Sequence, residues 1–149
     1  MQTIDIQPFY FIGNYVKTSN QDIAKLTADM QGLWQRFFSG NVGARIPNRV
    51  DRSICCIYTD YLGDYTQPYT AILGCRVRDL SAIPNGLMGF HFTGGKYQKL
   101  QTTTNQVFNK WQEIWKSDTK RAYSADFEVY DENATDPQTA PVDIFIAVK

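Results

Sequence analysis

Glu128 is the residue of this chain whose surroundings most strongly suggest a chemical role. It lies within residues 125–130, a run that is typical of a β-strand. Strand alternation places Phe127 and Val129 on one face, and it places Asp126, Glu128 and Tyr130 on the other. A carboxylate among aromatic rings attracts an organic cation, and each cation–π contact contributes about 0.5–2 kcal/mol. Burial raises the pKa of such an acid, and a cationic ligand relieves this cost.

Three pairs of similar segments indicate an internal duplication. In the same order in both halves, they are Phe11–Lys17 with Phe92–Lys99, Trp34–Phe38 with Trp111–Trp115, and Cys55–Asp60 with Phe127–Asp131. Such a repeat of roughly seventy residues predicts a pseudo-two-fold fold with a cleft at its axis. Alignment of Tyr58 with Tyr130 places Cys56 on Glu128. The two halves therefore differ at this point by one acid.

Two interpretations of Glu128 are open. The simpler one is that Glu128 is the outward polar position of a half-exposed strand. The other is that its face forms the wall of a cavity. The corresponding face of the first half carries Ile54, Cys56 and Tyr58. Together with Glu128 and Tyr130 this face is too apolar for plain solvent exposure, so we favour a cavity wall with one acid inside it.

A second aromatic cluster lies within residues 58–69. Tyr61, Tyr65 and Tyr69 are interspersed with aspartates around a predicted turn. The cluster is either the tyrosine-rich end of a hairpin or an aromatic rim of the same pocket. Trp111 and Trp115 fall on the apolar stripe of a predicted helix, where they are core residues that could expose an edge to the cleft.

Each half is expected to form a strand, a helix and two further strands. Strands are predicted at residues 4–17, with a break near Pro8 or Gly13, at 53–59 and 69–77, at 87–100, with an interruption at Gly94 and Gly95, and at 122–130 and 141–148. Helices are predicted after capping boxes at 19–22 and 103–106, and a loop at 41–52. The expected fold class is α+β, with duplicated strand-helix-strand-strand units, an antiparallel sheet, two helices on one face and a ligand cleft at the pseudo-two-fold axis. We expect the helices to cover the face of Phe127, which leaves the Glu128 face to line a groove. We also expect a single domain, 1–149, with repeat halves at about 1–80 and 85–149.

Composition argues against several classes of function. The chain has 15 Lys and Arg, 15 Asp and Glu, and 14% aromatic residues. Zero net charge argues against a direct nucleic-acid partner, which needs a basic excess. The three cysteines and one histidine show no metal-ligand spacing, so no metal is expected, and no motif predicts a cofactor. Because neither a signal peptide nor a membrane span is evident, we expect no membrane partner and a cytoplasmic location.

The segments Tyr58–Tyr69, Trp111–Trp115 and Asp126–Tyr130, in their duplicated order, resemble the GyrI-like, or bacterial AraC-type, effector-binding domain. The resemblance covers almost the whole chain and is closest to stand-alone effector-binding proteins of the integron-cassette type. It implies a pseudo-two-fold cleft in which many relatives bind lipophilic cations through a buried glutamate and aromatic walls. In regulators of this family the domain is fused to a DNA-binding module. No such module fits this chain, so we expect a free-standing ligand binder.

The resemblance also implies particular site residues. By position, the glutamate is Glu128, with Tyr130 beside it and Tyr58 opposite. Some relatives carry an acid where this chain has Leu62, so a second acidic contact is implied to be missing. The complete set of candidate ligand-binding residues is Glu128, Tyr130, Tyr58, Cys56, Tyr61, Tyr65, Trp111 and Trp115.

Three functions follow from these observations. The first is binding of a small hydrophobic or cationic organic molecule, which in this family extends to multidrug binding and transcription regulation. The second, implied for some relatives, is hydrolysis of small strained electrophiles with Glu128 as general base. The third is binding to a protein partner, either DNA gyrase or a regulator, through the acidic loop at 131–136. Ligand binding is favoured because the sequence shows neither a nucleophile–base pair nor a metal set.

Overall fold

The computed structural model describes residues 2–131 and 138–149, which form one eight-stranded antiparallel sheet with helices on one face. The strands are β1 (Gln2–Ile6), β2 (Phe9–Thr18), β3 (Ser53–Thr59), β4 (Tyr69–Val77), β5 (Met88–Phe92), β6 (Gly95–Thr103), β7 (Ala125–Asp131) and β8 (Pro141–Ala147). The helices are α1 (Ile23–Ser39), α2 (Val42–Arg45) and α3 (Val107–Lys116), with a 3₁₀ turn η1 (Thr104–Gln106) before α3. None of the described helices is both long and apolar enough to cross a membrane.

The order of the strands confirms the duplication. The sheet runs β1-β6-β8-β7-β3-β4-β2-β5, which is symmetric about the β7–β3 pair. Each half contributes one N-terminal strand to the other half, because β1 pairs with β6 and β5 pairs with β2. In the central pair Cys56 lies directly opposite Glu128. The pseudo-two-fold axis therefore passes beside the position at which the alignment places Glu128 on Cys56.

One of the three predicted repeat pairs is out of register. The segment starting at Phe11 was expected to match the segment starting at Phe92. The pairing of β2 with β4 and of β6 with β8 instead makes Phe11 equivalent to Tyr97. Both rings are buried in the same core cluster. The sequence alignment matched Phe92 because Gly94 follows it at the spacing at which Gly13 follows Phe11, although Gly94 lies in the turn before β6.

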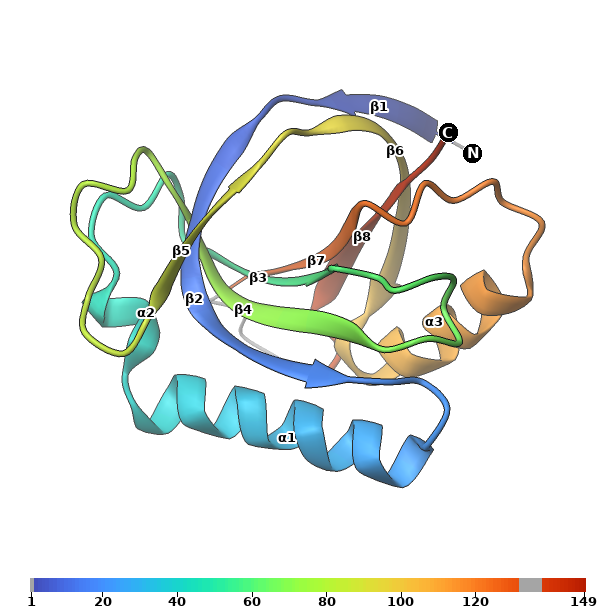
Figure 1. Ribbon diagram of the computed structural model, residues 1–149, viewed down its shortest axis with the longest axis horizontal. Coiled ribbons are helices and arrows are strands. Elements are labelled where there is room, and N and C mark those ends of the chain that lie inside the picture. The colour runs from blue at the N-terminus through green and yellow to red at the C-terminus, as the bar shows by residue number, and fades with distance from the viewer. Residues whose placement is uncertain (1, 132–137) are drawn as a thin grey trace.

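The sheet curls so strongly that it buries one of its own faces. Figure 1 shows β1 and β6 arching over the strands in the middle of the sheet. Inside the curl lies an apolar core that includes Cys55, Ile72, Tyr97 and Phe127. Gly13 and Gly74 face each other across β2 and β4, and a methyl group on either would collide with the backbone of the opposite strand. These two glycines let the strands approach closely where the sheet bends.

Helices α1 and α3 pack on the outer face of the curl, below and beside the sheet in Figure 1. Helix α1 packs on a cluster that includes Cys56 and Leu73, and α3 packs on Val142 and Ile144. The helices thus lie on the same face as Glu128. The expectation that they cover the face of Phe127 is wrong, because the curl already buries that face within the sheet.

Local boundaries differ from the prediction in several places. Asp22 caps α1 by accepting a hydrogen bond from the backbone N–H of Lys25, so the capping box expected at Ser19 is wrong. Of the two breaks considered for the strand at 4–17, the one near Pro8 is present and separates β1 from β2, because Pro8 has no N–H to donate to a ladder. The interruption predicted at Gly94 and Gly95 is present, but the parts that it separates, β5 and β6, lie in separate halves of the sheet. Part of the loop expected at 41–52 forms the short helix α2.

Candidate functional site

A cavity of about 630 Å³ lies between α1, α3 and the outer face of the sheet at the pseudo-two-fold axis. Helix α1 contributes Met30 and Trp34 to its wall, and the loop before β7 contributes Arg121. Of the candidate ligand-binding residues, those that line it are Glu128, Tyr130, Tyr58, Tyr61, Tyr65, Trp111 and Trp115. Cys56 is fully buried and is absent from the lining, so it forms part of the core beneath the cavity.

Glu128 is held at the base of the cavity by three hydrogen bonds from aromatic side chains. Its side chain is almost completely buried. Oε2 accepts from Tyr58 Oη at 2.9 Å and from Trp111 Nε1 at 2.6 Å, and Oε1 accepts from Tyr130 Oη at 2.6 Å. The two tyrosines come from the central strands β3 and β7, whereas the indole comes from α3. Alternation along β7 and the proximity of α3 thus produce a carboxylate surrounded by neutral donors.

The electrostatics of this group are dominated by burial. Desolvation raises the pKa of Glu128 above its ordinary value, and the hydrogen bonds from Tyr130, Trp111 and Tyr58 lower it, but less than burial raises it. Burial also raises the pKa of Tyr58 and of Tyr130, so both hydroxyls remain donors. Within residues 2–131 and 138–149, no lysine, arginine or histidine forms an ion pair with Glu128.

Two aromatic pairs frame Glu128 with the symmetry of the fold. Trp34 meets the ring of Tyr130 edge-on with centroids 5.0 Å apart, and Trp111 meets Tyr58 edge-on at 5.3 Å. Each helix therefore places its tryptophan against the tyrosine of the other half. This geometry confirms the predicted equivalence of Trp34 and Trp111. The symmetry breaks at the polar contact, because Trp111 donates to Glu128 whereas the symmetry-related position beside Trp34 is Cys56.

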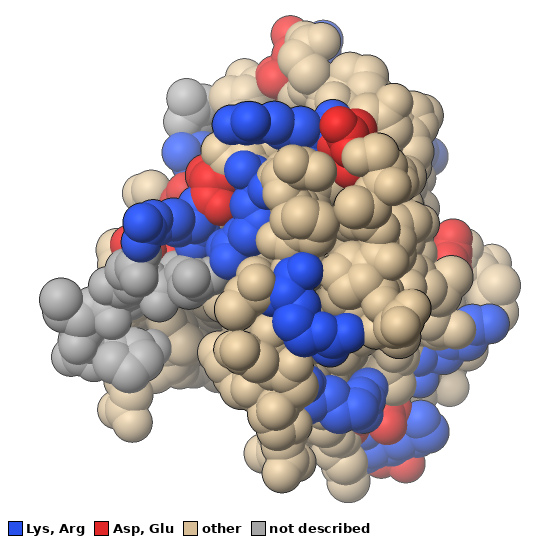
Figure 2. Space-filling view, turned by 90° about the vertical axis from the view of Figure 1, so that its left-hand side faces the viewer, with Lys and Arg blue, Asp and Glu red and all other residues tan. Residues whose placement is uncertain are grey.

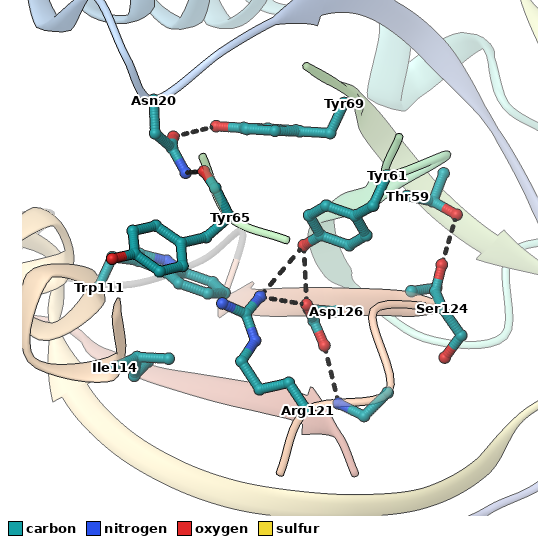
Figure 3. A network of polar contacts seen from close by, with 12 residues as sticks. Asn20, Thr59, Tyr61, Tyr65, Tyr69, Trp111, Ile114, Arg121, Ser124 and Asp126 are labelled. Carbon is teal, nitrogen blue, oxygen red and sulfur yellow. Dashed lines mark hydrogen bonds and ion pairs between the residues drawn. The ribbon is translucent and has the colours of Figure 1, made fainter. Parts of the chain in front are cut away.

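A second buried polar cluster lies beside the first. Arg121 Nη2 and Tyr61 Oη both lie 2.7 Å from Asp126 Oδ2, and Ala147 N donates to Asp126 Oδ1 at 2.7 Å. Figure 3 shows this cluster at the edge of the aromatic wall. The charged side chains are 4% exposed for Arg121 and 0% for Asp126. This is a fully buried ion pair, with the hydroxyl of Tyr61 as a third member.

Sequence reasoning missed Arg121 and Asp126 as parts of the site. A signal for Asp126 was present, because the alignment that places Cys56 on Glu128 also places Ile54 on Asp126. The second half therefore adds two acids on this face. Arg121 gave no comparable signal, since it lies in an irregular segment where no periodicity indicates a direction.

The turn between β3 and β4 closes one side of the cavity. Tyr65 stacks on Trp115 with ring planes 7° apart and centroids 5.9 Å apart. Asn20 joins this turn to the start of α1, because its Nδ2 donates to the carbonyl of Tyr65 and its Oδ1 accepts from Tyr69 Oη. The tyrosine-rich cluster is therefore a rim of the pocket. Leu62 does not line the cavity and is 78% exposed, so an acid at this position would face solvent.

The surface away from the cavity carries mixed charge. Figure 2 shows lysine and arginine side chains interleaved with acidic and uncharged residues on one face of the molecule. Most of the acidic loop that was considered as a protein-binding surface, residues 132–136, lies outside the described residues. Across the described part of the chain, no cluster of histidine, cysteine, aspartate and glutamate could hold a metal ion.

Comparisons with known proteins place these features in a family context. A model of the family described as "Integron-associated effector binding protein" matches residues 4–148. The putative transcriptional regulator protein YobU of Bacillus subtilis (strain 168) is 27% identical over 146 residues, covering 93% of this chain and 91% of YobU.

Two solved structures share the fold. An integron cassette protein from the mobile metagenome of Vibrio cholerae superposes with a TM-score of 0.75 at 28% identity, covering 99% of this chain and 95% of that one. SAV2435 bound to tetraphenylphosphonium superposes with a TM-score of 0.77 at 17% identity, covering 99% and 93%. At the lower identity the likeness concerns the fold alone.

Proposed function

The chain belongs to the integron-associated effector binding protein family, and we propose that the effector it binds is a lipophilic organic monocation, held by Glu128 within the aromatic cavity. Small-molecule binding is the activity of the family. What we propose for this chain in particular is the charge of the ligand and its size class.

The observation that carries the proposal is the state of Glu128. It is a buried carboxylate that receives three hydrogen bonds from neutral donors and, among the described residues, no ion pair. An unpaired buried charge is costly, and neutral donors offset only part of that cost. A monocation in the cavity would compensate the charge directly. A neutral ligand of the same shape would leave it uncompensated.

The walls suit the same ligand. Tyr58, Tyr130, Trp34 and Trp111 surround the acid with π-systems, whose faces attract cations more strongly when water is excluded. The cavity volume of about 630 Å³ is within the range of about 300–1,000 Å³ typical of small-molecule sites. A cation bearing several aromatic rings would fill such a space.

Charge balance favours one positive charge over two. Asp126 is already neutralised by Arg121. Cys56 replaces the symmetry-related acid, and the position of Leu62 points into solvent. In the described part of the cavity wall, Glu128 is therefore the one acid left without a cationic partner. A dication would carry a second charge into a site that has no acid for it.

The proposal is tested by calorimetric titration with methyltriphenylphosphonium and with 1,1,1-triphenylethane, its neutral carbon counterpart. We expect the wild-type protein to bind the cation at least about tenfold more tightly than the neutral compound, a difference of about 1.4 kcal/mol. Glu128→Gln should abolish this preference. Glu113→Gln is the matched control, because Glu113 is an exposed glutamate on α3. Equal affinities of wild type and Glu128→Gln for the cation would refute the proposal.

The other two functions stay predictions. No observation in the described residues favours hydrolysis with Glu128 as general base, or binding to gyrase or a regulator. The transcriptional role in the name of YobU belongs to that relative. A regulatory role for this chain would follow only if ligand binding were coupled to a partner.

A further inference from the structure

Arg121 is a buried cation with unused hydrogen-bonding capacity. Its Nη2 contacts Asp126 at 2.7 Å and lies 3.5 Å from Tyr61 Oη. Its Nε and Nη1 are buried and have no hydrogen-bond partner among the described residues. Buried N–H groups are rarely left unpaired, so two on a single guanidinium point to a missing acceptor.

The guanidinium is held firmly in place. Its central carbon lies 4.4 Å from the ring centroid of Tyr123 and 5.8 Å from those of Tyr61 and Trp111. Tyr123 reaches this position with a backbone φ of 55°, which is unfavourable for a bulky residue. The backbone of Arg121 is fixed by an antiparallel bridge to Val148. The structure thus retains a strained turn that packs a ring against the guanidinium.

Arg121 lines the same cavity as Glu128. Trp111 connects the two groups, because its indole N–H donates to Glu128 while its ring lies over the guanidinium. Figure 3 shows the guanidinium between Asp126 and Tyr61 on one side and Trp111 and Tyr65 on the other. A ligand cation near Glu128 and an acceptor near Arg121 would therefore both contact Trp111.

The expected partner of these N–H groups is a neutral acceptor and not an anion. Asp126 already compensates the charge of Arg121 at 2.7 Å. A carboxylate or phosphate entering here would meet the repulsion of Asp126 together with the attraction of Arg121. A ketone, amide or sulfonyl oxygen accepts the same N–H donors without adding a charge.

We propose that Arg121 forms an acceptor subsite in this cavity, so that the preferred effector is a lipophilic cation carrying a carbonyl-type oxygen beyond its charged centre. This inference rests on the proposed cation-binding function. Both unpaired N–H groups are buried, so entry of the acceptor includes a local movement of a side chain that packs on the guanidinium. Arg121 then fixes the orientation of the ligand, whereas Glu128 selects its charge.

The test uses triphenylphosphonium cations with a ketone on alkyl tethers of two to five carbons, each paired with an alkyl cation of equal length. The measured quantity is the ratio of the two affinities within each pair, in which general changes of the pocket cancel. For wild type we expect the ketone to bind at least about tenfold more tightly at one tether length, as expected for a hydrogen bond to a charged donor. In Arg121→Lys, which retains a charge for Asp126 but lacks Nε and Nη1, the ratio should fall to about one.

A second variant guards against misfolding. Arg121→Met combined with Asp126→Asn removes both charges together. The amide oxygen introduced at position 126 can still accept from Ala147 N. This double variant should also give an affinity ratio of about one. A ketone advantage that survives in both variants would overturn the subsite. The subsite would also be rejected if the wild-type protein bound every alkyl cation but preferred no ketone. In that case the proposed cation-binding function would stand. Failure of wild type to bind any of the cations would reject both proposals.

Discussion

Cys56 and Glu128 face each other across the central β3–β7 pair, and they are also equivalent positions of the two halves. Both properties hold together only for residues beside the pseudo-two-fold axis. The exchange of one side chain there converts a symmetric apolar floor into a charged one. Trp34 and Trp111, which are related by the same axis, then acquire different environments.

This relationship predicts that the acid can be moved across the axis. Glu128→Cys should weaken binding of a lipophilic monocation by at least about tenfold. Adding Cys56→Glu should restore part of that affinity, because Trp34 and Tyr130 pack as Trp111 and Tyr58 do. Calorimetric titration of both variants measures the recovery. A folded double variant with no more affinity than Glu128→Cys would show that the two sides of the axis are not functionally equivalent.

Cation binding should depend on pH through Glu128. The pKa of Glu128 is raised by burial, so protonation removes the charge that attracts the ligand at a higher pH than for an ordinary glutamate. Affinity should therefore rise with pH through this raised pKa and then level off, and binding should release a proton. Titration in buffers with different ionisation enthalpies measures the proton. Glu128→Gln should give a flat profile, and a wild-type profile of the same flatness would contradict the assignment.

The same shift affects stability with a defined sign. A raised pKa means that the folded state holds the proton of Glu128 more tightly than the unfolded state does. The contribution of this group to the free energy of unfolding is therefore present in full below the unfolded-state pKa. It is lost as the pH rises through the folded-state pKa. Urea unfolding at several pH values should show that the free energy of unfolding falls less over this pH interval in Glu128→Gln than in wild type.

The hydrogen-bond donors of Glu128 should tune its proton affinity. Tyr58→Phe and Tyr130→Phe each remove one donor to the carboxylate, so each should raise the pKa of Glu128 further. Cation affinity below this further raised pKa should fall by at least about tenfold, because a hydrogen bond to a charged group contributes about 1.5–3 kcal/mol. Tyr15→Phe is the matched control, since Tyr15 is 44% exposed. An upward shift of the midpoint of the pH profile distinguishes this effect from a simple loss of packing.

The central part of this fold could be predicted from the sequence. Alternation placed Phe127 and Glu128 on opposite faces of one strand, and helical spacing identified Trp34 and Trp111 as equivalent. These inferences hold because they depend on local geometry, which the period of each element determines. The Cys56 mismatch was visible for the same reason, since β3 and β7 have equal lengths and no bulge between them.

The rest depends on long-range geometry that no local pattern encodes. Alternation separates two faces but does not say which one lies inside the curl, so the helices were assigned to the face of Phe127. The exchange of β1 and β5 between the halves has no sequence signature either. Arg121 reaches the cavity from an irregular turn in which Tyr123 has a positive φ. Such a conformation in a non-glycine residue is set by tertiary contacts and not by propensity.

The buried pair of Arg121 and Asp126 should be a strong determinant of stability. Removing one partner leaves an uncompensated charge in a site that solvent does not reach. Arg121→Met should therefore lower the free energy of unfolding by about 3–5 kcal/mol. Tyr61→Phe removes only a neutral donor to Asp126 and should cost about 1 kcal/mol.

A double-mutant cycle separates the pair from its surroundings. Arg121→Met together with Asp126→Leu removes both charges, and an apolar replacement of a buried ion pair is often neutral or stabilising. The double variant should therefore be more stable than Arg121→Met alone, with urea unfolding as the measurement. The unpaired N–H of Ala147, which loses its acceptor on Asp126, limits the recovery. The losses in free energy of unfolding of Arg121→Met and Asp126→Leu, each measured alone, could instead simply add in the double variant. That result would show that the two charges do not compensate each other and that these buried positions matter only for their packing.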